Sequence, residues 1–183
     1  MLPVAMVGYV SSPRARATRR ALALAGGALA LASCSRVAGP LAASRILVAD
    51  PARRGVELRL LAGETGADAG FNFDGYAQGR LTVVVPVGWR VDVACVNRST
   101  VLTHSCAVVE DRPLSPYGAP PAFPGASVPD ARHGLGFGQT AHFSFVAGRP
   151  GRYRIADLVV GHELDGSWDW LVVRRGVRPG VES

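Results

Sequence analysis

The sequence predicts an all-β domain of about eight short strands arranged as a sandwich. Its 183 residues, 48% of them hydrophobic, are enough to bury one core. The 22 Gly and 13 Pro break the apolar stretches into short pieces that recur about every ten residues. No amphipathic stretch after the N-terminal segment is long enough for a helical bundle. The glycine-rich stretch 134–139 has no helix pattern behind it, so it is predicted to be a turn and not a phosphate-binding loop.

The N-terminal segment is predicted to be an export signal. Residues 14–20 hold four arginines, and residues 21–32 form an Ala, Leu and Gly run that is too short for a permanent membrane span. Residues 18–22 resemble the twin-arginine signal, although ordinary export signals also begin with arginine. Residues 31–34 resemble a lipobox, in which Cys34 carries the lipid and becomes the mature N-terminus. The alternatives are an uncleaved anchor and an ordinary signal with a chance cysteine.

Cleavage before Cys34 changes the charge balance. The whole chain has 20 basic residues against 14 acidic ones, a net charge of +6. Without the four arginines of the signal the net charge falls to +2. The basic character therefore belongs mostly to the signal, and no nucleic-acid partner is expected. The expected organisation is a signal peptide (1–33), a lipidated cysteine and tether (34–50), a folded domain (51–176) and a frayed tail (177–183).

Each strand is predicted from a short apolar or alternating stretch bounded by Gly, Pro or polar residues. Residues 80–97 supply two strands divided at a Pro-Val-Gly-Trp turn, and residues 111–138 form a long loop. Residues 71–79 are rich in turn signals. In residues 140–148, two Phe share one face and His142 lies on the other. The other predicted strands are residues 45–50, 56–63, 104–110, 151–160 and 168–176.

Two cysteines remain once Cys34 is assigned to the lipid. An even pair in an oxidising compartment favours a disulfide. Cys95 shares a strand face with two valines, and Cys106 lies on the same face as His104, so both thiols should point into the core. We predict a Cys95–Cys106 disulfide; the alternative is two buried free thiols.

Several motifs occur together in one order along the chain. They are the Phe-Asn-Phe-x-Gly opening at 71–75, the turn at 86–89, His104-Ser105, the Phe-Pro-Gly-Ala loop at 123–126, and Gly161-His162. With these motifs, residues 70–173 resemble sulfocyanin, a membrane-anchored blue-copper protein of the cupredoxin superfamily. The resemblance implies a Greek-key cupredoxin sandwich. It also implies an extracytoplasmic electron-transfer role beside a respiratory or envelope partner.

The resemblance also implies a ligand set. In the family, copper is held by an early His and by the Cys, His and Met of a Cys-x4-His-x4-Met loop. The two histidines match His104 and His162, but the Cys position holds Asp157 and the Met position holds Ser167. The implied metal ligands are therefore His104, His162 and Asp157, with Ser167 as a weak axial donor.

Replacement of the thiolate changes the chemistry that the resemblance implies. A blue-copper site depends on a Cu–thiolate bond, whereas a carboxylate is a hard donor that favours Cu(II) or Zn(II) and does not stabilise Cu(I). We therefore expect a non-blue copper site or a zinc site. Two alternatives stay open. Asp157 could be solvated or paired with arginine, and the protein could be a metal-free interaction module that uses the 111–138 loop.

The other candidate donors are weaker on sequence grounds. Glu163 and Asp165 flank His162, and either could replace Asp157 as the carboxylate donor. Cys106 would restore a thiolate only if it pointed at the loop and not into the core. His133 and His142 are expected to be surface residues.

The aromatic and catalytic patterns add two further expectations. Trp170 is expected to pack in the core, and Trp168 near the mouth of the site. There is no Ser-His-Asp spacing and no His-Glu-x-x-His motif, so we do not expect an enzyme.

Overall fold

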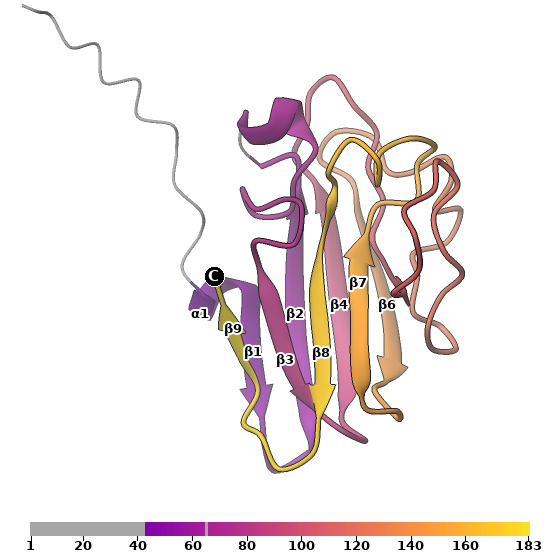
Figure 1. The fold of residues 1–183 in the computed structure, drawn as a ribbon. Coiled ribbons are helices and arrows are strands. Elements are labelled where there is room, and N and C mark those ends of the chain that lie inside the picture. The colour runs from indigo at the N-terminus through magenta and orange to yellow at the C-terminus, as the bar shows by residue number, and fades with distance from the viewer. Residues whose placement is uncertain (1–42, 65) are drawn as a thin grey trace, which may run out of the picture. The chain divides into compact units, whose positions relative to one another are not determined.

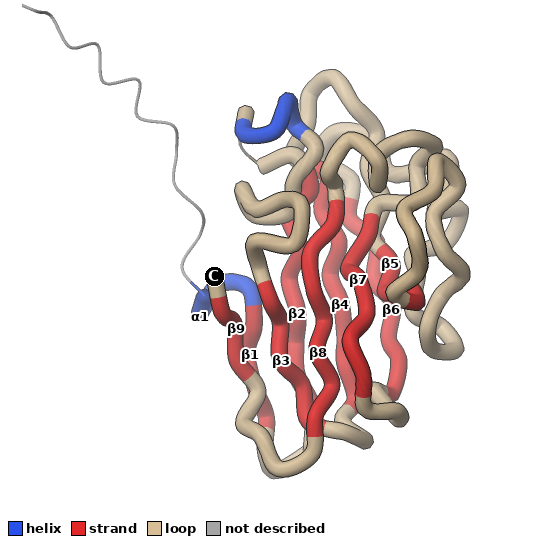
Figure 2. The backbone as a smooth tube through the Cα atoms, viewed as in Figure 1, coloured by secondary structure: helices blue, strands red, loops and turns tan. Residues whose placement is uncertain are grey.

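The computed structural model describes residues 43–64 and 66–183, which fold as two β-sheets packed face to face (Figures 1 and 2). One sheet has the strand order β1-β2-β4-β6 and the other β5-β7-β8-β3-β9. Besides these strands, the described residues form only the short helix α1 (Ala43–Ile46) and a 3-10 turn (Ala67–Gly70). The strands are β1 (Leu47–Asp50), β2 (Gly55–Ala62), β3 (Thr82–Pro86), β4 (Arg90–Asn97), β5 (Ala107–Glu110), β6 (Thr140–Val146), β7 (Gly151–Ala156), β8 (Trp168–Arg174) and β9 (Gly180–Glu182).

Each sheet mixes parallel and antiparallel neighbours. Strand β2 pairs in parallel with β4, and β3 pairs in parallel with β8. The remaining neighbours are antiparallel. Parallel neighbours cannot be joined by a hairpin. Strands β2, β3, β4 and β5 instead lie alternately in the two sheets, so the chain crosses from one sheet to the other after β2, after β3 and after β4. The predicted all-β sandwich is confirmed, with nine strands where about eight were expected.

The core between the sheets follows from the alternation of side chains along the strands. In β4, Val91, Val93 and Cys95 are buried, while the residues between them are partly exposed. Phe123 stacks on Phe145 of β6, with ring centroids 5.2 Å apart. Part of the predicted 111–138 loop is therefore packed into the core.

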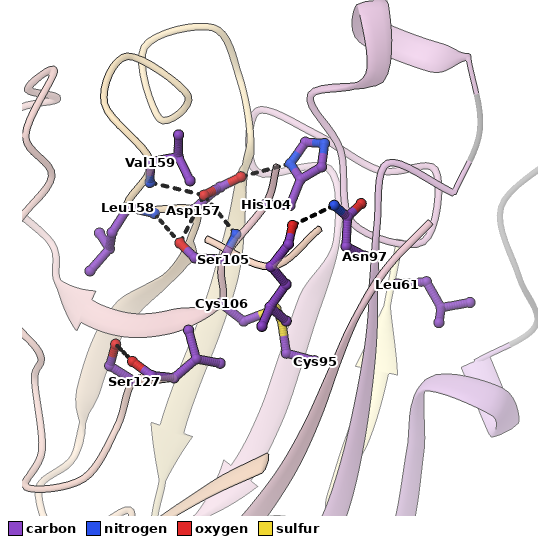
Figure 3. The surroundings of a disulfide bond; sticks show 12 residues. Leu61, Cys95, Asn97, His104, Ser105, Cys106, Ser127, Asp157, Leu158 and Val159 are labelled. Atoms are coloured by element: carbon purple, nitrogen blue, oxygen red, sulfur yellow. Dashed lines mark hydrogen bonds and ion pairs between the residues drawn. A yellow bond between two sulfur atoms is a disulfide. The ribbon is translucent and has the colours of Figure 1, made fainter. Parts of the chain in front are cut away.

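A disulfide connects the two sheets beside the loops that carry the histidines. Cys95 of β4 is bonded to Cys106, which directly precedes β5, and both residues are fully buried (Figure 3). Their Cα atoms lie 5.9 Å apart. The bond fixes the end of the 98–106 connection, on which His104 lies.

The ends of the domain differ from the sequence prediction. Residues 43–46 of the expected tether form α1, and β1 lies within the predicted strand 45–50 and pairs with β2. Residues 177–183 were expected to be frayed, but they contain β9, which pairs with β3. The alternation signal is weak for β9 because it is a short strand at a sheet edge. The expected signal peptide and Cys34 lie outside the described residues. Within the described residues, no helix has the length and apolar character needed to cross a membrane.

Several loops meet at one end of the sandwich, which we call the site end. Strand β7 ends there at Ala156, opposite the first residues of β5 and β8, Ala107 and Trp168. The connection after β4 reaches the same end, because Asn97 Nδ2 donates hydrogen bonds to the carbonyls of Leu102 and Leu135. In Figure 1 these connections form the upper part of the molecule.

Candidate metal centre

The loop between β7 and β8 is closed by its own backbone hydrogen bonds. Asp157 N donates to Ser167 O at 3.0 Å, and Ser167 N donates to His162 O at 2.9 Å. His162 N donates to Val159 O at 3.1 Å. Gly161 has a φ of 89°, which few other residues adopt, and this lets the chain turn just before His162. The loop therefore brings its first, sixth and last residues together.

The backbone of His104 is held by the glycine-rich segment before β6. His104 N donates to Leu135 O at 3.1 Å, and Leu135 N donates to His104 O at 2.6 Å. Gly134 has a φ of 75°, and a Cβ there would lie 3.0 Å from His104 O. The stretch predicted as a turn therefore also supports His104, which the sequence pattern did not indicate.

Three predicted ligand residues meet inside the site end. Asp157 Oδ2 lies 2.7 Å from His104 Nδ1 and 2.9 Å from His162 Nδ1. One ligand atom of each residue lies within 4.8 Å of the others. Asp157 and His104 are 0% exposed, and His162 is 8% exposed. The carboxylate is therefore neither solvated nor paired with arginine.

The second carboxylate oxygen of Asp157 is fixed by Ser105. Oδ1 accepts hydrogen bonds from Ser105 N at 2.9 Å and Ser105 Oγ at 2.8 Å, and also from Val159 N at 3.0 Å (Figure 3). Ser105 Oγ in turn accepts a hydrogen bond from Leu158 N at 2.7 Å. The sequence placed Ser105 only in the His-Ser motif, and its spacing gave no sign of this role.

The hydrogen bonds decide the charge of Asp157. Burial raises the pKa of this carboxyl, but the hydrogen bonds from His104 and His162 lower it, and the net direction is downward. Asp157 is therefore ionised at neutral pH. Each histidine can be neutral with its proton on Nδ1, directed at the carboxylate.

Two buried polar atoms around these residues have no hydrogen-bond partner among the described residues. They are His104 Nε2 and Ser167 Oγ. Gly63 packs against the first of them, since a Cβ on Gly63 would lie 3.0 Å from His104 Nε2. On the other side, the Phe71 ring meets His162 edge-on with centroids 4.9 Å apart. The imidazoles are thus held by close packing as well as by Asp157.

The flanking carboxylates do not join the cluster. Glu163 is buried, and its Oε1 accepts a hydrogen bond from Arg154 Nε at 2.7 Å. Arg154 also donates to Asp111 Oδ1 at 3.0 Å, which ties the loop to the chain after β5. Asp165 is exposed. Asp157 is therefore the carboxylate that faces both histidines.

The remaining candidates lie elsewhere. Cys106 is in the disulfide, so it offers no thiolate. The side chain of His133 is 83% exposed and hydrogen-bonded to Asp130, and His142 is exposed on β6. Trp170 was expected in the core, but it is only partly buried and does not belong to the core between the sheets. The alternation of β8 explains this, because Asp169 and Leu171 take the inward positions.

The family follows from comparison with known sequences. A model described as the Sulfocyanin (SoxE) domain matches residues 43–179, most of the chain. The chain belongs to the sulfocyanin family. The resemblance carried by the sequence motifs is thus confirmed, and the two-sheet fold is the one it implied.

Solved structures of auracyanins and of a rusticyanin give matches to this sulfocyanin. Reduced auracyanin from the photosynthetic bacterium Roseiflexus castenholzii has 21% identity and a TM-score of 0.47, over 64% of this chain and 95% of that chain. Auracyanin B has 17% identity and a TM-score of 0.47, over 69% and 94%. A rusticyanin has 19% identity and a TM-score of 0.47, over 66% and 77%. No curated protein gives a significant match.

Proposed function

We propose that this sulfocyanin is an extracytoplasmic protein, anchored through a lipid on Cys34, that binds divalent copper at a non-blue site. The ligands would be His104, Asp157 and His162, with Ser167 Oγ as a weak further donor. The main support for this proposal is that Asp157 Oδ2 contacts the Nδ1 atom of each of the two histidines, and that all three side chains are buried. Such a protein would serve a respiratory or envelope partner, and no catalytic residue is assigned.

The donor set fits a divalent ion that accepts both nitrogen and oxygen ligands. It consists of two imidazole nitrogens and one ionised carboxylate, which suit Cu(II) and Zn(II). The separations of 2.7 and 2.9 Å are hydrogen-bond distances, so an ion bound here would take the place of the protons between the carboxylate and the two rings.

The protein's own groups would prepare the site. Ser105 and Val159 N hold Oδ1, which leaves Oδ2 directed at the two Nδ1 atoms. Binding at both Nδ1 atoms requires their protons to leave or to move to Nε2. Bound copper supplies one-electron chemistry, but this set has no thiolate to stabilise Cu(I). Fast electron transfer is therefore not part of the proposal.

A metal-free interaction module is the second candidate, and a specific observation favours it. Both Nδ1 atoms are already hydrogen-bonded to Asp157, so the group is stable without an ion. A proton on His104 Nε2 would also find no acceptor among the described residues. In this case the His-Asp-His group would be a structural replacement for the metal.

Copper titration separates these candidates. All the described strands, the disulfide and the three ligand residues lie after residue 43, so a chain beginning at Ser35 retains the fold. Calorimetry with Cu(II) should show one tight site and only weak visible absorption. His104→Ala and His162→Ala should each weaken binding about a hundredfold or more. His133→Ala and His142→Ala are the matched controls and should leave the affinity unchanged.

The spectrum tests the role of Asp157. Asp157→Cys combined with Ser167→Met restores the sulfur donors of the family, and we expect an intense charge-transfer band with Cu(II). Asp157→Ser offers neither thiolate nor carboxylate and should lack both the band and tight binding. An intense band in the unmodified protein would contradict the non-blue site. Absence of copper binding would favour the metal-free module.

A further inference from the structure

The end of the sandwich opposite the site end is built from four neighbouring turns. They are residues 51–54, 87–89, 147–150 and 175–179, and Figure 1 shows them at the bottom of the molecule. Backbone hydrogen bonds connect them. Gly88 N donates to Ala147 O at 2.8 Å, Val87 N to Arg174 O at 2.9 Å, and Arg90 N to Arg54 O at 3.0 Å.

Exposed arginines surround these turns, and we call this surface the basic end. Half of the arginines are neutralised by ion pairs with Asp50, Asp92, Glu110 and Asp111. Among the described residues, Arg54, Arg174, Arg175 and Arg178 form no ion pair. The exposed arginines of the basic end are Arg53, Arg54, Arg90, Arg149, Arg152, Arg174, Arg175 and Arg178.

The excess of positive charge is specific to this end. At the site end, Arg80 and Arg98 are ion-paired with acidic side chains. The exposed Arg132 there is offset by the exposed Asp130 and Asp165. The mature chain carries only a small net charge, so the domain is electrostatically polarised along its length.

We propose that the basic end docks on an anionic lipid surface, so that the site end faces away from the membrane. Guanidinium groups pair well with phosphate oxygens. Each arginine close to an anionic membrane strengthens binding roughly fivefold. The orientation in the cell rests on the proposed lipid anchor, whereas the affinity of the basic end for lipid does not.

The geometry of the chain allows this contact. Strand β1 runs from Leu47 to Asp50 toward the basic end, so the chain enters the domain about one short strand away from it. The segment between Cys34 and Ala43 can reach on the order of 30 Å. A domain attached at Cys34 can therefore rest its basic end on the same membrane.

A lipid surface fits the arrangement of these arginines better than an acidic protein does. Arg174, Arg175 and Arg178 lie at the end of β8 and in the turn after it, and Arg54 lies on the turn between β1 and β2. Within residues 43–64 and 66–183, no ion pair fixes these four side chains. Lipid headgroups can rearrange around scattered cations, whereas a protein partner must offer carboxylates at matching positions. Docking through this end also leaves the site end facing solution, where a partner could reach it.

Vesicle binding tests the proposal on the chain beginning at Ser35. We expect binding to vesicles of phosphatidylcholine with phosphatidylglycerol at low salt, little binding to pure phosphatidylcholine, and release at high salt. The triple variant Arg174→Gln, Arg175→Gln, Arg178→Gln should bind at least tenfold more weakly. The matched control Arg59→Gln, Arg112→Gln, Arg132→Gln removes the same charge elsewhere and should lose less than about threefold.

Three outcomes would overturn the proposal. They are equal binding to neutral and anionic vesicles, equal losses in the two triple variants, and no loss in either. The last outcome would leave the basic end as a candidate contact for an acidic protein. Copper titration of the Arg174, Arg175 and Arg178 variant should match the unmodified chain, so failure of the lipid proposal is distinguishable from failure of the metal proposal.

Tryptophan quenching tests the orientation on the full chain in the same vesicles. Trp89 lies at the basic end and Trp168 begins β8 at the site end, whereas Trp170 lies between the two ends, where its ring contacts Arg152. Lipids with brominated acyl chains should quench Trp89 more than the other two. Most of the quenching should therefore disappear in Trp89→Phe. Quenching that persists in this variant would place the site end on the membrane and contradict the proposal.

Discussion

At the scale of single residues, the replacement of a thiolate by a carboxylate decides what this sulfocyanin can bind. An ionised carboxylate between two histidines attracts either protons or a hard cation. Asp157 is fully buried, and it remains charged because five hydrogen bonds reach its two oxygens. The three side chains are therefore buried and held by hydrogen bonds, which those of a vestigial surface cluster would not be.

Ser105 is expected to stabilise this arrangement strongly. Ser105→Ala removes the hydroxyl donor to Asp157 and leaves Leu158 N, a buried donor, without its acceptor. An unsatisfied buried group costs about 1–3 kcal/mol, so we expect the free energy of unfolding to fall by about 2 kcal/mol. Urea unfolding followed by circular dichroism measures this.

Ser127→Ala is the matched control for Ser105. The Ser127 hydroxyl makes only a local bond to Val128 O and is partly exposed, so its loss should change stability by less than about 0.5 kcal/mol. Equal effects of the two substitutions would show that the Ser105 hydroxyl does not stabilise the carboxylate.

Sequence reasoning reached part of this site. The spacing of the family loop singled out Asp157 and His162, and the His-Ser motif singled out His104; the structure brings these three residues together. It did not reveal Ser105 as the partner of Asp157. A hydrogen bond between residues 52 positions apart depends on where two loops meet, and no local pattern encodes that.

At the scale of elements, the hairpin at residues 73–76 buries the carboxyl group of Asp74. Asp74 and Gly75 have φ values of 54° and 84°, the positive values of a tight hairpin turn for which Asp-Gly and Asn-Gly are preferred. The side chain of Asp74 turns inward, where Oδ2 accepts a hydrogen bond from Leu61 N at 3.3 Å. Oδ1 has no partner among the described residues.

This carboxyl should make stability depend on pH. Burial raises the pKa of Asp74 from 3.8 to about 7, although the Leu61 hydrogen bond opposes the shift. The folded state then holds a proton that the unfolded chain loses, so the contribution of this carboxyl to stability is greatest below pH 4 and falls as the pH rises to 7. The loss is on the order of 4 kcal/mol above pH 7.

Asp74→Asn should abolish this loss and keep the turn. We expect it to raise the free energy of unfolding at pH 8 by a few kcal/mol, and the gain to shrink at pH 4. The measurement is urea unfolding at a series of pH values. Asp50→Asn, at a partly exposed position, is the control and should show no such trend. A gain that is independent of pH would show that turn preference, and not ionisation, explains it.

The disulfide acts at the same scale because it closes the loop that carries His104. The sequence separation of the two cysteines is 11, and closing a loop of this size stabilises the fold by about 3 kcal/mol in the chain-entropy model. Cys95→Ala with Cys106→Ala should therefore lower the free energy of unfolding by at least that much. It should also weaken copper binding, because His104 precedes Cys106 by two residues.

Treatment with a reductant provides the control for the cysteine variant. The unmodified protein should lose stability when it is reduced, while the double variant should not respond. A reductant effect on the double variant, or none on the unmodified protein, would contradict a stabilising role for the bond.

At the scale of the whole molecule, the sandwich was predictable, but its edge strand β9 was not. Apolar and polar residues alternate in β4 and β6, and the apolar face of each strand can be buried only against a second layer, so the pattern predicts a sandwich. Strand β9 has only three residues and carries no such pattern, which is why residues 177–183 looked like a tail. The charge asymmetry was also hidden, because it requires knowing that four turns distant in sequence lie together.

The whole fold should persist without metal, in contrast to small domains that need an ion to fold. The core between the sheets, the disulfide and the hydrogen bonds of Asp157 are all made by atoms of the chain itself. Chelation should therefore leave the circular dichroism spectrum unchanged. Added Cu(II) at about 100 times its dissociation constant should stabilise the protein by about 2.7 kcal/mol and raise its melting temperature. Calorimetric scans of His104→Ala, which should show no rise, provide the comparison. If chelation unfolded the protein, the ion would be part of the core, and the hydrogen-bonded carboxylate could not be the resting state of the site.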